Sequence, residues 1–257
     1  MTVAGRRILV PVTAGRRDMA VRLADAGAVV TEVEFIEVIG SSDAEGLTDA
    51  TLAWCDGGFD WLAVTSRNAV LAMHRIAQGH GRELAEGLTA GRVATVGEAT
   101  RSTCASVGLD VALVPTERQD ARGIAQAFAE GPGRVLVPLG DLASPVLARG
   151  LAGKGWDVTR VEAYRVVDGP GVDAETAAAL AAGAFDAVLL TSGSVAERFA
   201  PFAAPADAGT LVVAIGATTA ASARAAGLAV HATSTVPSYD GILAALESAW
   251  QSPKEGS

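Results

Sequence analysis

Hydroxyl side chains follow apolar segments at two matching places in the sequence. The segment FDWLAV runs into Thr65 and Ser66, and the segment FDAVLL runs into Thr191 and Ser192. Each Thr-Ser pair is expected where a strand ends and a helix begins, so its hydroxyls can either cap the helix or turn toward a ligand. A plain helix cap and a ligand contact account equally well for any one of these residues, but their repetition favours ligand binding for the set.

A second repeated feature places glycine before a helix. The stretches Gly97–Thr100 and Gly216–Thr219 each follow an apolar run and open a helical pattern. The first turn of a helix has N–H groups without intrahelical partners and the positive end of the helix dipole. Such a helix start can bind a carboxylate without a nearby lysine, so these stretches predict an anion-binding site.

Several other chemistries lack their sequence signatures. Neither GxxxxGK[ST] nor GxGxxG follows the first apolar runs, which end at Val10 and Val137, and this disfavours nucleotide use. Ser66, Ser192 and Ser194 lack the GxSxG setting of a serine nucleophile. The histidines, His74, His80 and His231, have no metal-ligand spacing. The sequence therefore predicts neither a cofactor nor a metal.

Composition indicates a globular protein without a broad nucleic-acid surface. The chain has 257 residues, of which 50% are hydrophobic, enough for two domains with separate cores. Its formal net charge of −9 argues against a broad nucleic-acid surface, because phosphate binding needs clustered Lys and Arg. No apolar run is long enough for a membrane helix. The sequence begins without a signal-peptide pattern, and Cys55 and Cys104 form no CxxC pair, so a reduced, cytoplasmic protein is expected.

The chain also contains an internal duplication in three blocks. The block from Arg7 to Val38 matches the block from Arg134 to Val166. The second pair is FDWLAVTSRNAV against FDAVLLTSGSVA. The third pair is GRVATVGEATRSTCASVGLDV against GTLVVAIGATTAASARAAGLAV. Each copy then ends in a further helical stretch, 123–129 and 241–250. Three blocks in the same order predict two copies of one structural unit.

Strands alternate with helices in both copies, and this pattern predicts parallel sheets. A crossover between parallel strands must be long enough to hold a helix. The predicted fold class is therefore α/β, with two doubly wound parallel-sheet domains. Ligands of such sheets gather outside the carboxyl ends of the strands, where the Thr-Ser pairs and glycines are expected. If the two domains oppose each other, these positions line one cleft.

Three motifs together resemble those of uroporphyrinogen-III synthases. They are TSRNAV at 65–70, VEAYRV at 161–166 and IGATTA at 215–220, and with their spacing they span nearly the whole chain. The resemblance implies two flavodoxin-like domains joined by a two-stranded linker, residues 34–39 and 164–169. One domain is then discontinuous, 1–37 with 168–257, and the other, 40–165, is inserted into it.

The resemblance also implies an activity. The family cyclises hydroxymethylbilane to uroporphyrinogen III, with loss of water and inversion of the terminal pyrrole ring. Expected partners are the linear tetrapyrrole alone, without nucleic acid or membrane, and a monomer is expected. The same compound can close spontaneously to the uninverted isomer, so holding it in one reactive geometry is the larger task. This fits a sequence without an evident acid, base or nucleophile constellation.

The resemblance further implies which residues form the site. Tyr164 matches the recurrent tyrosine of the VEAYR-like motif and is expected to donate a hydrogen bond to the departing hydroxyl. Its alternative role is that of a packing tyrosine with a satisfied hydroxyl. The expected substrate-binding residues are Thr65, Ser66, Asn68, Gly97, Thr100, Thr191, Ser192, Ser194, Gly216, Thr218, Thr219 and Arg16.

The chain departs from the family pattern at two positions. Val12 and Leu139 stand where relatives frequently have arginine. Arg16 and Arg17 are the nearest replacements after the first strand, although a charged pair that begins a helix is more often a solvated face. A non-catalytic protein that binds a tetrapyrrole or small anion therefore remains an alternative. A sugar-nucleotide transferase is a weaker one, because diphosphate-binding glycines and acidic metal ligands are lacking.

Overall fold

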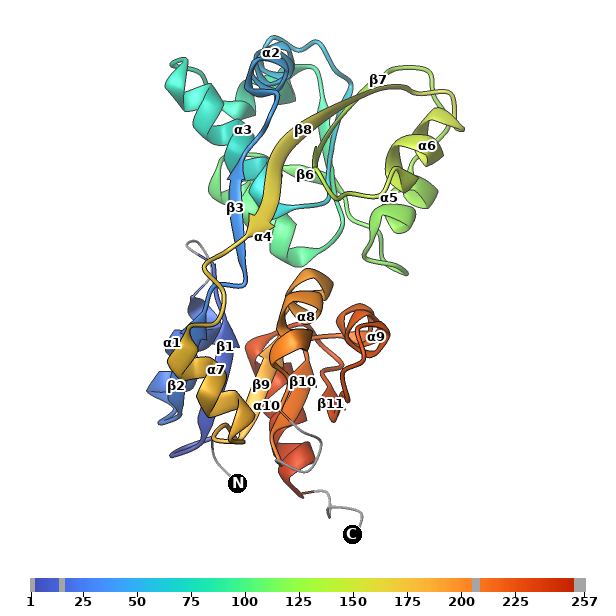
Figure 1. Ribbon diagram of the computed structural model, residues 1–257. Coiled ribbons are helices and arrows are strands. Elements are labelled where there is room, and N and C mark those ends of the chain that lie inside the picture. Colours follow the sequence, from blue (N-terminus) through green and yellow to red (C-terminus); the bar gives the residue numbers. More distant parts are fainter. Residues whose placement is uncertain (1–2, 14–16, 205–208, 252–257) are drawn as a thin grey trace. The chain divides into compact units, whose positions relative to one another are not determined.

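The computed structural model describes residues 3–13, 17–204 and 209–251, and the chain divides into two compact units. Unit 1 comprises Met1–Glu37 and Val167–Ser257, and unit 2 comprises Val38–Val166. Each unit contains one sheet with helices packed against it (Figure 1). The expected α/β fold with parallel sheets is confirmed.

Unit 1 has a five-stranded sheet in the order β11-β10-β9-β1-β2. Every neighbouring pair in it is parallel. The strands are β1 (Arg7–Pro11), β2 (Val29–Val33), β9 (Ala187–Leu190), β10 (Leu211–Ala214) and β11 (Ala232–Thr233). Because β1 pairs with both β2 and β9, the central strand joins the two separate chain segments of this unit.

Helices cover both faces of this sheet. Leu9 and Val188 pack on one face with α7 (Ala174–Ala181), α8 (Gly193–Phe199) and α9 (Ala217–Ala225), and the short helix η2 (Ala200–Phe202) follows α8. Ile8 and Leu189 pack on the other face with α1 (Asp18–Asp25) and α10 (Tyr239–Gln251). Neighbouring strand residues point to opposite faces, so a strand buried on both faces reads as a continuous apolar run.

Unit 2 has a six-stranded sheet in the order β3-β8-β7-β4-β5-β6. The pairs β8-β7, β7-β4, β4-β5 and β5-β6 are parallel. The strands are β3 (Ile36–Gly40), β4 (Trp61–Val64), β5 (Arg92–Thr95), β6 (Val111–Leu113), β7 (Arg134–Gly140) and β8 (Asp157–Asp168). Both β3 and β8 cross the boundary between the units and are neighbours in this sheet.

The faces of the second sheet are covered in the same manner. One core contains Leu62 and Val93 with side chains from α2 (Ala44–Cys55), α3 (Arg67–Gly79), η1 (Leu84–Thr89) and α4 (Glu98–Ser106). The other core contains Ala63 and Ala94 with side chains from α5 (Ala121–Ala127) and α6 (Val146–Ala152). The strand order therefore brings helices from different parts of unit 2 onto each face.

The two sheets place the duplicated blocks at matching positions. The strands β1, β2, β9, β10 and β11 correspond to β7, β8, β4, β5 and β6, and both sets have the same spatial order. In unit 2 the strands that match β1 and β2 come last along the chain. The final helix of each copy begins two residues before its expected start, at Ala121 and Tyr239.

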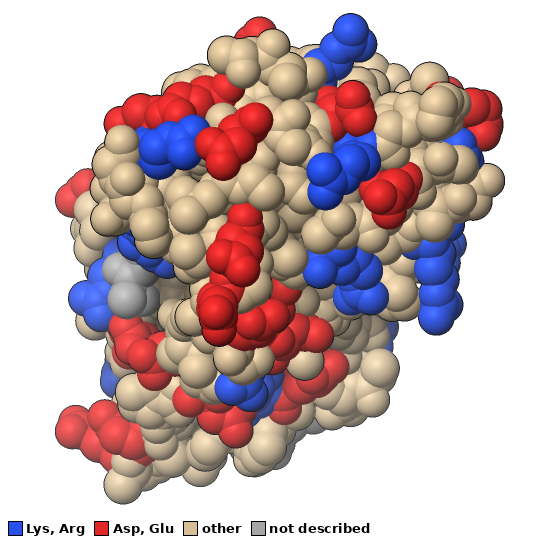
Figure 2. Space-filling model, turned by 90° about the horizontal axis from the view of Figure 1, so that it is seen from above, with Lys and Arg blue, Asp and Glu red and all other residues tan. Residues whose placement is uncertain are grey.

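Charged side chains on the face shown in Figure 2 are interspersed. Lys and Arg form separate groups among Asp and Glu, and no broad basic patch is seen on this face.

Candidate functional site

One group of predicted site residues lies at the carboxyl end of β4. Thr65 and Ser66 follow this strand, and Ser66 is the N-cap residue of α3. The Ser66 hydroxyl oxygen accepts a hydrogen bond from the N–H of Asn68, with a distance of 3.2 Å. A hydroxyl can donate one hydrogen bond while it accepts another, so the cap leaves its O–H available to a ligand. All three side chains are partly exposed.

Unit 1 repeats this arrangement at the carboxyl end of β9. Thr191 and Ser192 follow the strand, and Ser192 is the N-cap residue of α8. Its hydroxyl oxygen accepts from the N–H of Val195 at 3.2 Å. Ser194 lies in the first turn and is partly exposed. Helix capping is thus a role of both serines, and it leaves ligand binding open to each of them.

Glycine precedes a helix on the neighbouring strand of each sheet. Gly97 lies between β5 and α4, and Gly216 lies between β10 and α9. Both residues are extended, and neither helix has a side-chain cap. The first N–H groups of these helices therefore have neither an intrahelical partner nor a capping side chain, and they carry the positive end of the helix dipole. Each is a place where a carboxylate can bind.

The threonines that follow these glycines differ in exposure. Thr100 and Thr219 are only 5% and 6% exposed, whereas Thr218 is exposed. Thr100 and Thr219 occupy equivalent positions in the first turns of α4 and α9. Burial at both positions indicates that these two side chains pack beneath the helix starts, while Thr218 is accessible to a ligand.

Tyr164 lies on β8 in unit 2, on the strand next to β7. Its side chain is partly buried and packs against the core that contains α2, α3 and α4. Within the described part of the chain, the Tyr164 hydroxyl has no hydrogen-bond partner. A partly exposed phenol with an unused donor is suited to hydrogen-bond a ligand.

The neighbouring carboxylate of β8 has a structural role. Glu162 accepts hydrogen bonds from the N–H of Ser42, at 2.7 Å, and from the hydroxyls of Ser42 and Ser41. The Ser42 N–H, followed by these hydroxyls, lowers the pKa of Glu162. The contact fixes the chain that leads into α2 against β8.

The arginines expected near the first strand are only partly described. Arg16 lies outside the described residues. Arg17 forms ion pairs with Glu32 and Glu34, at 3.4 and 3.3 Å. These carboxylates compensate the charge of Arg17. Val12 and Leu139, which stand at the places where relatives have arginine, are each 4% exposed and contribute to the apolar cores.

Arg67 was not among the residues expected in the site. It is the first residue of α3, between Ser66 and Asn68, and it is partly exposed. Its Nε donates a hydrogen bond to the hydroxyl of Thr103 at 3.1 Å. Its guanidinium has no carboxylate partner among the described residues. The sequence could have indicated Arg67, because this residue lies inside the TSRNAV motif at 65–70.

Three further features bear on what the chain can bind. No cluster of three or more His, Cys, Asp or Glu side chains in the described ranges is placed to hold a metal ion. None of the described helices is long and apolar enough to span a membrane. Cys55 and Cys104 are free and buried, and burial raises the pKa of Cys104 to about 12.

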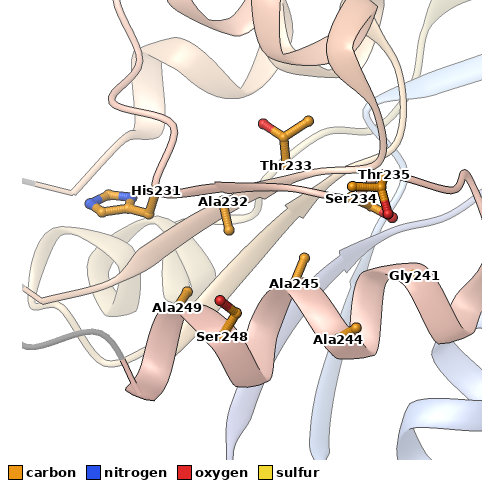
Figure 3. A pocket seen from close by; sticks show the side chains of 10 residues that line it. All are labelled: His231, Ala232, Thr233, Ser234, Thr235, Gly241, Ala244, Ala245, Ser248 and Ala249. Atoms are coloured by element: carbon orange, nitrogen blue, oxygen red, sulfur yellow. The ribbon is translucent and has the colours of Figure 1, made fainter.

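Unit 1 also has a hollow of about 360 Å³ between β11 and α10. Figure 3 shows Ala245 and Ala249 projecting from the helix toward the strand, and Thr233 projecting away from the helix. His231, at its border, accepts a hydrogen bond at Nδ1 from the N–H of Val212. Neither Lys nor Arg is among the residues that line it, and none of the predicted site residues lies there. The hollow is therefore not part of the predicted site.

Comparisons of this chain with family models and with solved structures point to the same family. A model of the family "Uroporphyrinogen-III synthase HemD" matches residues 17–244. A mutant uroporphyrinogen III synthase from Thermus thermophilus is 18% identical, with a TM-score of 0.67, over 96% of this chain and 99% of that chain. Uroporphyrinogen-III synthetase from Helicobacter pylori is 16% identical, with a TM-score of 0.62, over 95% and 99%. Among curated protein sequences no match is found.

Proposed function

Because this chain belongs to the uroporphyrinogen-III synthase (HemD) family, we propose how its own residues carry out the family's reaction. The protein cyclises hydroxymethylbilane to uroporphyrinogen III in tetrapyrrole biosynthesis. Water is lost and the terminal pyrrole ring is inverted as the macrocycle closes. The proposal concerns which groups hold the substrate and which group contacts the departing hydroxyl.

Uncharged donors hold the carboxylates of the substrate. The helix starts at Gly97 and Gly216 present N–H groups without side-chain caps. Ser66 and Ser192 accept one hydrogen bond from their helices and retain an O–H donor. Fixed amide dipoles carry no net charge, so an acidic chain can bind a polyanion locally. Thr65, Asn68, Thr191, Ser194 and Thr218 are the further partly or fully exposed residues proposed to contact the substrate.

Tyr164 acts on the leaving group. The lone pair of the pyrrole nitrogen expels the hydroxyl, and the Tyr164 O–H donates a hydrogen bond to the departing oxygen. The observation that carries this assignment is that the partly exposed Tyr164 hydroxyl has no hydrogen-bond partner in the described part of the chain. A packing tyrosine whose hydroxyl donates to another protein group would not have this donor free for a ligand.

The two units are proposed to be flavodoxin-like domains joined by β3 and the end of β8. The order β2-β1-β9-β10-β11 in unit 1 corresponds to the flavodoxin-like order 2-1-3-4-5. In unit 2, β8-β7-β4-β5-β6 has the same spatial order. A monomeric state and a cytoplasmic location remain predictions from the sequence.

The experiment compares wild-type protein with Tyr164→Phe on freshly prepared hydroxymethylbilane. Wild-type protein should form type III isomer above the spontaneous type I background, and the variant should lose most of this turnover while keeping its fold. Only type I product from the wild type would instead support a non-catalytic binding protein. Unchanged kinetics in the variant would remove the role assigned to Tyr164.

A further inference from the structure

The ring of Tyr164 lies directly over Gly140, the last residue of β7. A Cβ atom added to Gly140 would be 2.7 Å from Cζ and 2.9 Å from the hydroxyl oxygen of Tyr164. These separations are shorter than the contacts of about 3.5–4.0 Å at which carbon atoms pack. The space that an ordinary side chain needs at residue 140 is therefore filled by the reactive end of the tyrosine.

The backbone of Gly140 does not itself require glycine. Eleven glycines of the described chain have a positive φ, and Gly140 is not one of them. An alanine could adopt the same backbone conformation without strain. The tyrosine ring, rather than a turn, is what excludes a side chain here.

A register shift brings these two residues together. Leu139 pairs with Glu162, whereas Gly140 pairs with Tyr164, so Ala163 is an extra residue on β8. Such a bulge changes the direction in which a neighbouring side chain points. Asp141 holds the shifted strand, because its N–H donates to the Tyr164 carbonyl and its carboxylate accepts from the N–H of Val166, both at 3.1 Å.

The other copy of the duplicated block provides an internal comparison. When β1 is aligned with β7 and β2 with β8, Thr13 corresponds to Gly140 and Ile36 corresponds to Tyr164. The copy without the tyrosine thus also lacks the glycine. A residue with a side chain is accepted at this place after the central strand of unit 1, so the fold common to both copies does not require glycine there.

We propose that Gly140 is a positioning residue for the cyclisation reaction. Its missing side chain lets the Tyr164 ring lie against the end of β7, and this sets where the hydroxyl is presented. The inference rests on the role proposed for Tyr164. Since the far end of the tyrosine side chain is what an added Cβ meets, Gly140→Ala should move the ring and leave the sheet in place.

The test is a double-mutant cycle on the full chain, with type III isomer formation as the readout. Gly140→Ala should lower kcat by about tenfold to a hundredfold, with little change in KM, because displacement of a reacting group by about 1 Å has effects of this size. In the Tyr164→Phe background the same substitution should lower kcat no further. The matched control is Gly40→Ala in β3, the strand beside β8. An added Cβ there meets nothing within 4 Å, and the kcat of this variant should equal that of wild type.

Three results would overturn the inference in distinguishable ways. If Gly140→Ala lowers kcat equally in the wild type and in Tyr164→Phe, Gly140 supports the fold of the unit and does not position the Tyr164 hydroxyl. A normal kcat for Gly140→Ala beside an impaired Tyr164→Phe would remove the role of Gly140 alone. Normal kinetics of Tyr164→Phe would remove the role of Tyr164 and this inference with it.

A folding defect in Gly140→Ala would also be informative. The substitution would then be repeated with Tyr164→Ala, which removes the ring that the new Cβ meets. If the double variant has the same unfolding midpoint as the single variant Tyr164→Ala, the contact with the ring is the reason for glycine at residue 140. A lower midpoint in the double variant would refute this reason.

Discussion

Replacing Thr95 with valine should stabilise unit 2, because Thr95 is a buried polar residue whose hydroxyl has no partner among the described residues. Thr95 is 0% exposed, and its hydroxyl has no hydrogen-bond partner among the described residues. A buried unsatisfied polar group costs about 1–3 kcal/mol, and valine has the same shape without that group. The equivalent residue of the other copy is Ala214, also 0% exposed, so the position accepts an apolar side chain. The free energy of unfolding should therefore rise by about 1–3 kcal/mol.

Urea unfolding followed by tryptophan fluorescence would measure this change, because Trp54 is fully buried in a core of the same unit. The matched control is Thr51→Val. Thr51 is equally buried, but its hydroxyl donates to the Leu47 carbonyl at 2.7 Å. Loss of that bond should cost about 0.5–1.5 kcal/mol, so the two substitutions should shift the midpoint in opposite directions. A midpoint for Thr95→Val at or below that of wild type would refute the argument.

Three further predictions follow from other contacts. Folding lowers the pKa of Glu162, so the carboxylate contributes fully to stability above its ordinary pKa of 4.5. This contribution is lost as the pH falls through the folded pKa. In acid unfolding curves, Glu162→Gln should therefore show a smaller fall in stability with decreasing pH than the wild type. Ser192→Ala should lower the unfolding free energy by about 0.5–2 kcal/mol and raise KM about tenfold, and an unchanged KM would leave only the capping role. Asp141→Ala should lower kcat more than Asp141→Asn, which keeps an oxygen for the Val166 N–H; equal losses in the two variants would contradict this.

The α/β fold was predictable because its local signals are strong. The runs Ile8–Val10 and Val135–Val137 are 0% exposed throughout, as expected for strands covered on both faces. Gly27 and Gly155 have positive φ values of 89° and 87°, which glycine adopts readily, and each follows a helix that periodicity already indicated. Duplication strengthened these signals, since each was seen twice.

The candidate site was predictable only in part. Ser66 and Ser192 could be placed at helix starts because a hydroxyl after a buried strand has a local structural meaning. The contact between Gly140 and Tyr164 depends on a register shift between two strands, and no local pattern reveals strand register. The burial of Thr100 and Thr219, compared with the exposure of Thr218, likewise depends on how each helix packs.

The insertion of unit 2 within unit 1 has a consequence for synthesis of the protein. The strand β1 needs β9 as its second neighbour, and residues 38–166 must be translated before β9 emerges. At 5–20 residues per second, this delay is on the order of ten seconds. The inserted unit can therefore complete its sheet on the ribosome while β1 still exposes an unpaired edge. Chaperone binding to the nascent chain should accordingly concentrate on residues 1–37, and release should coincide with the appearance of β9.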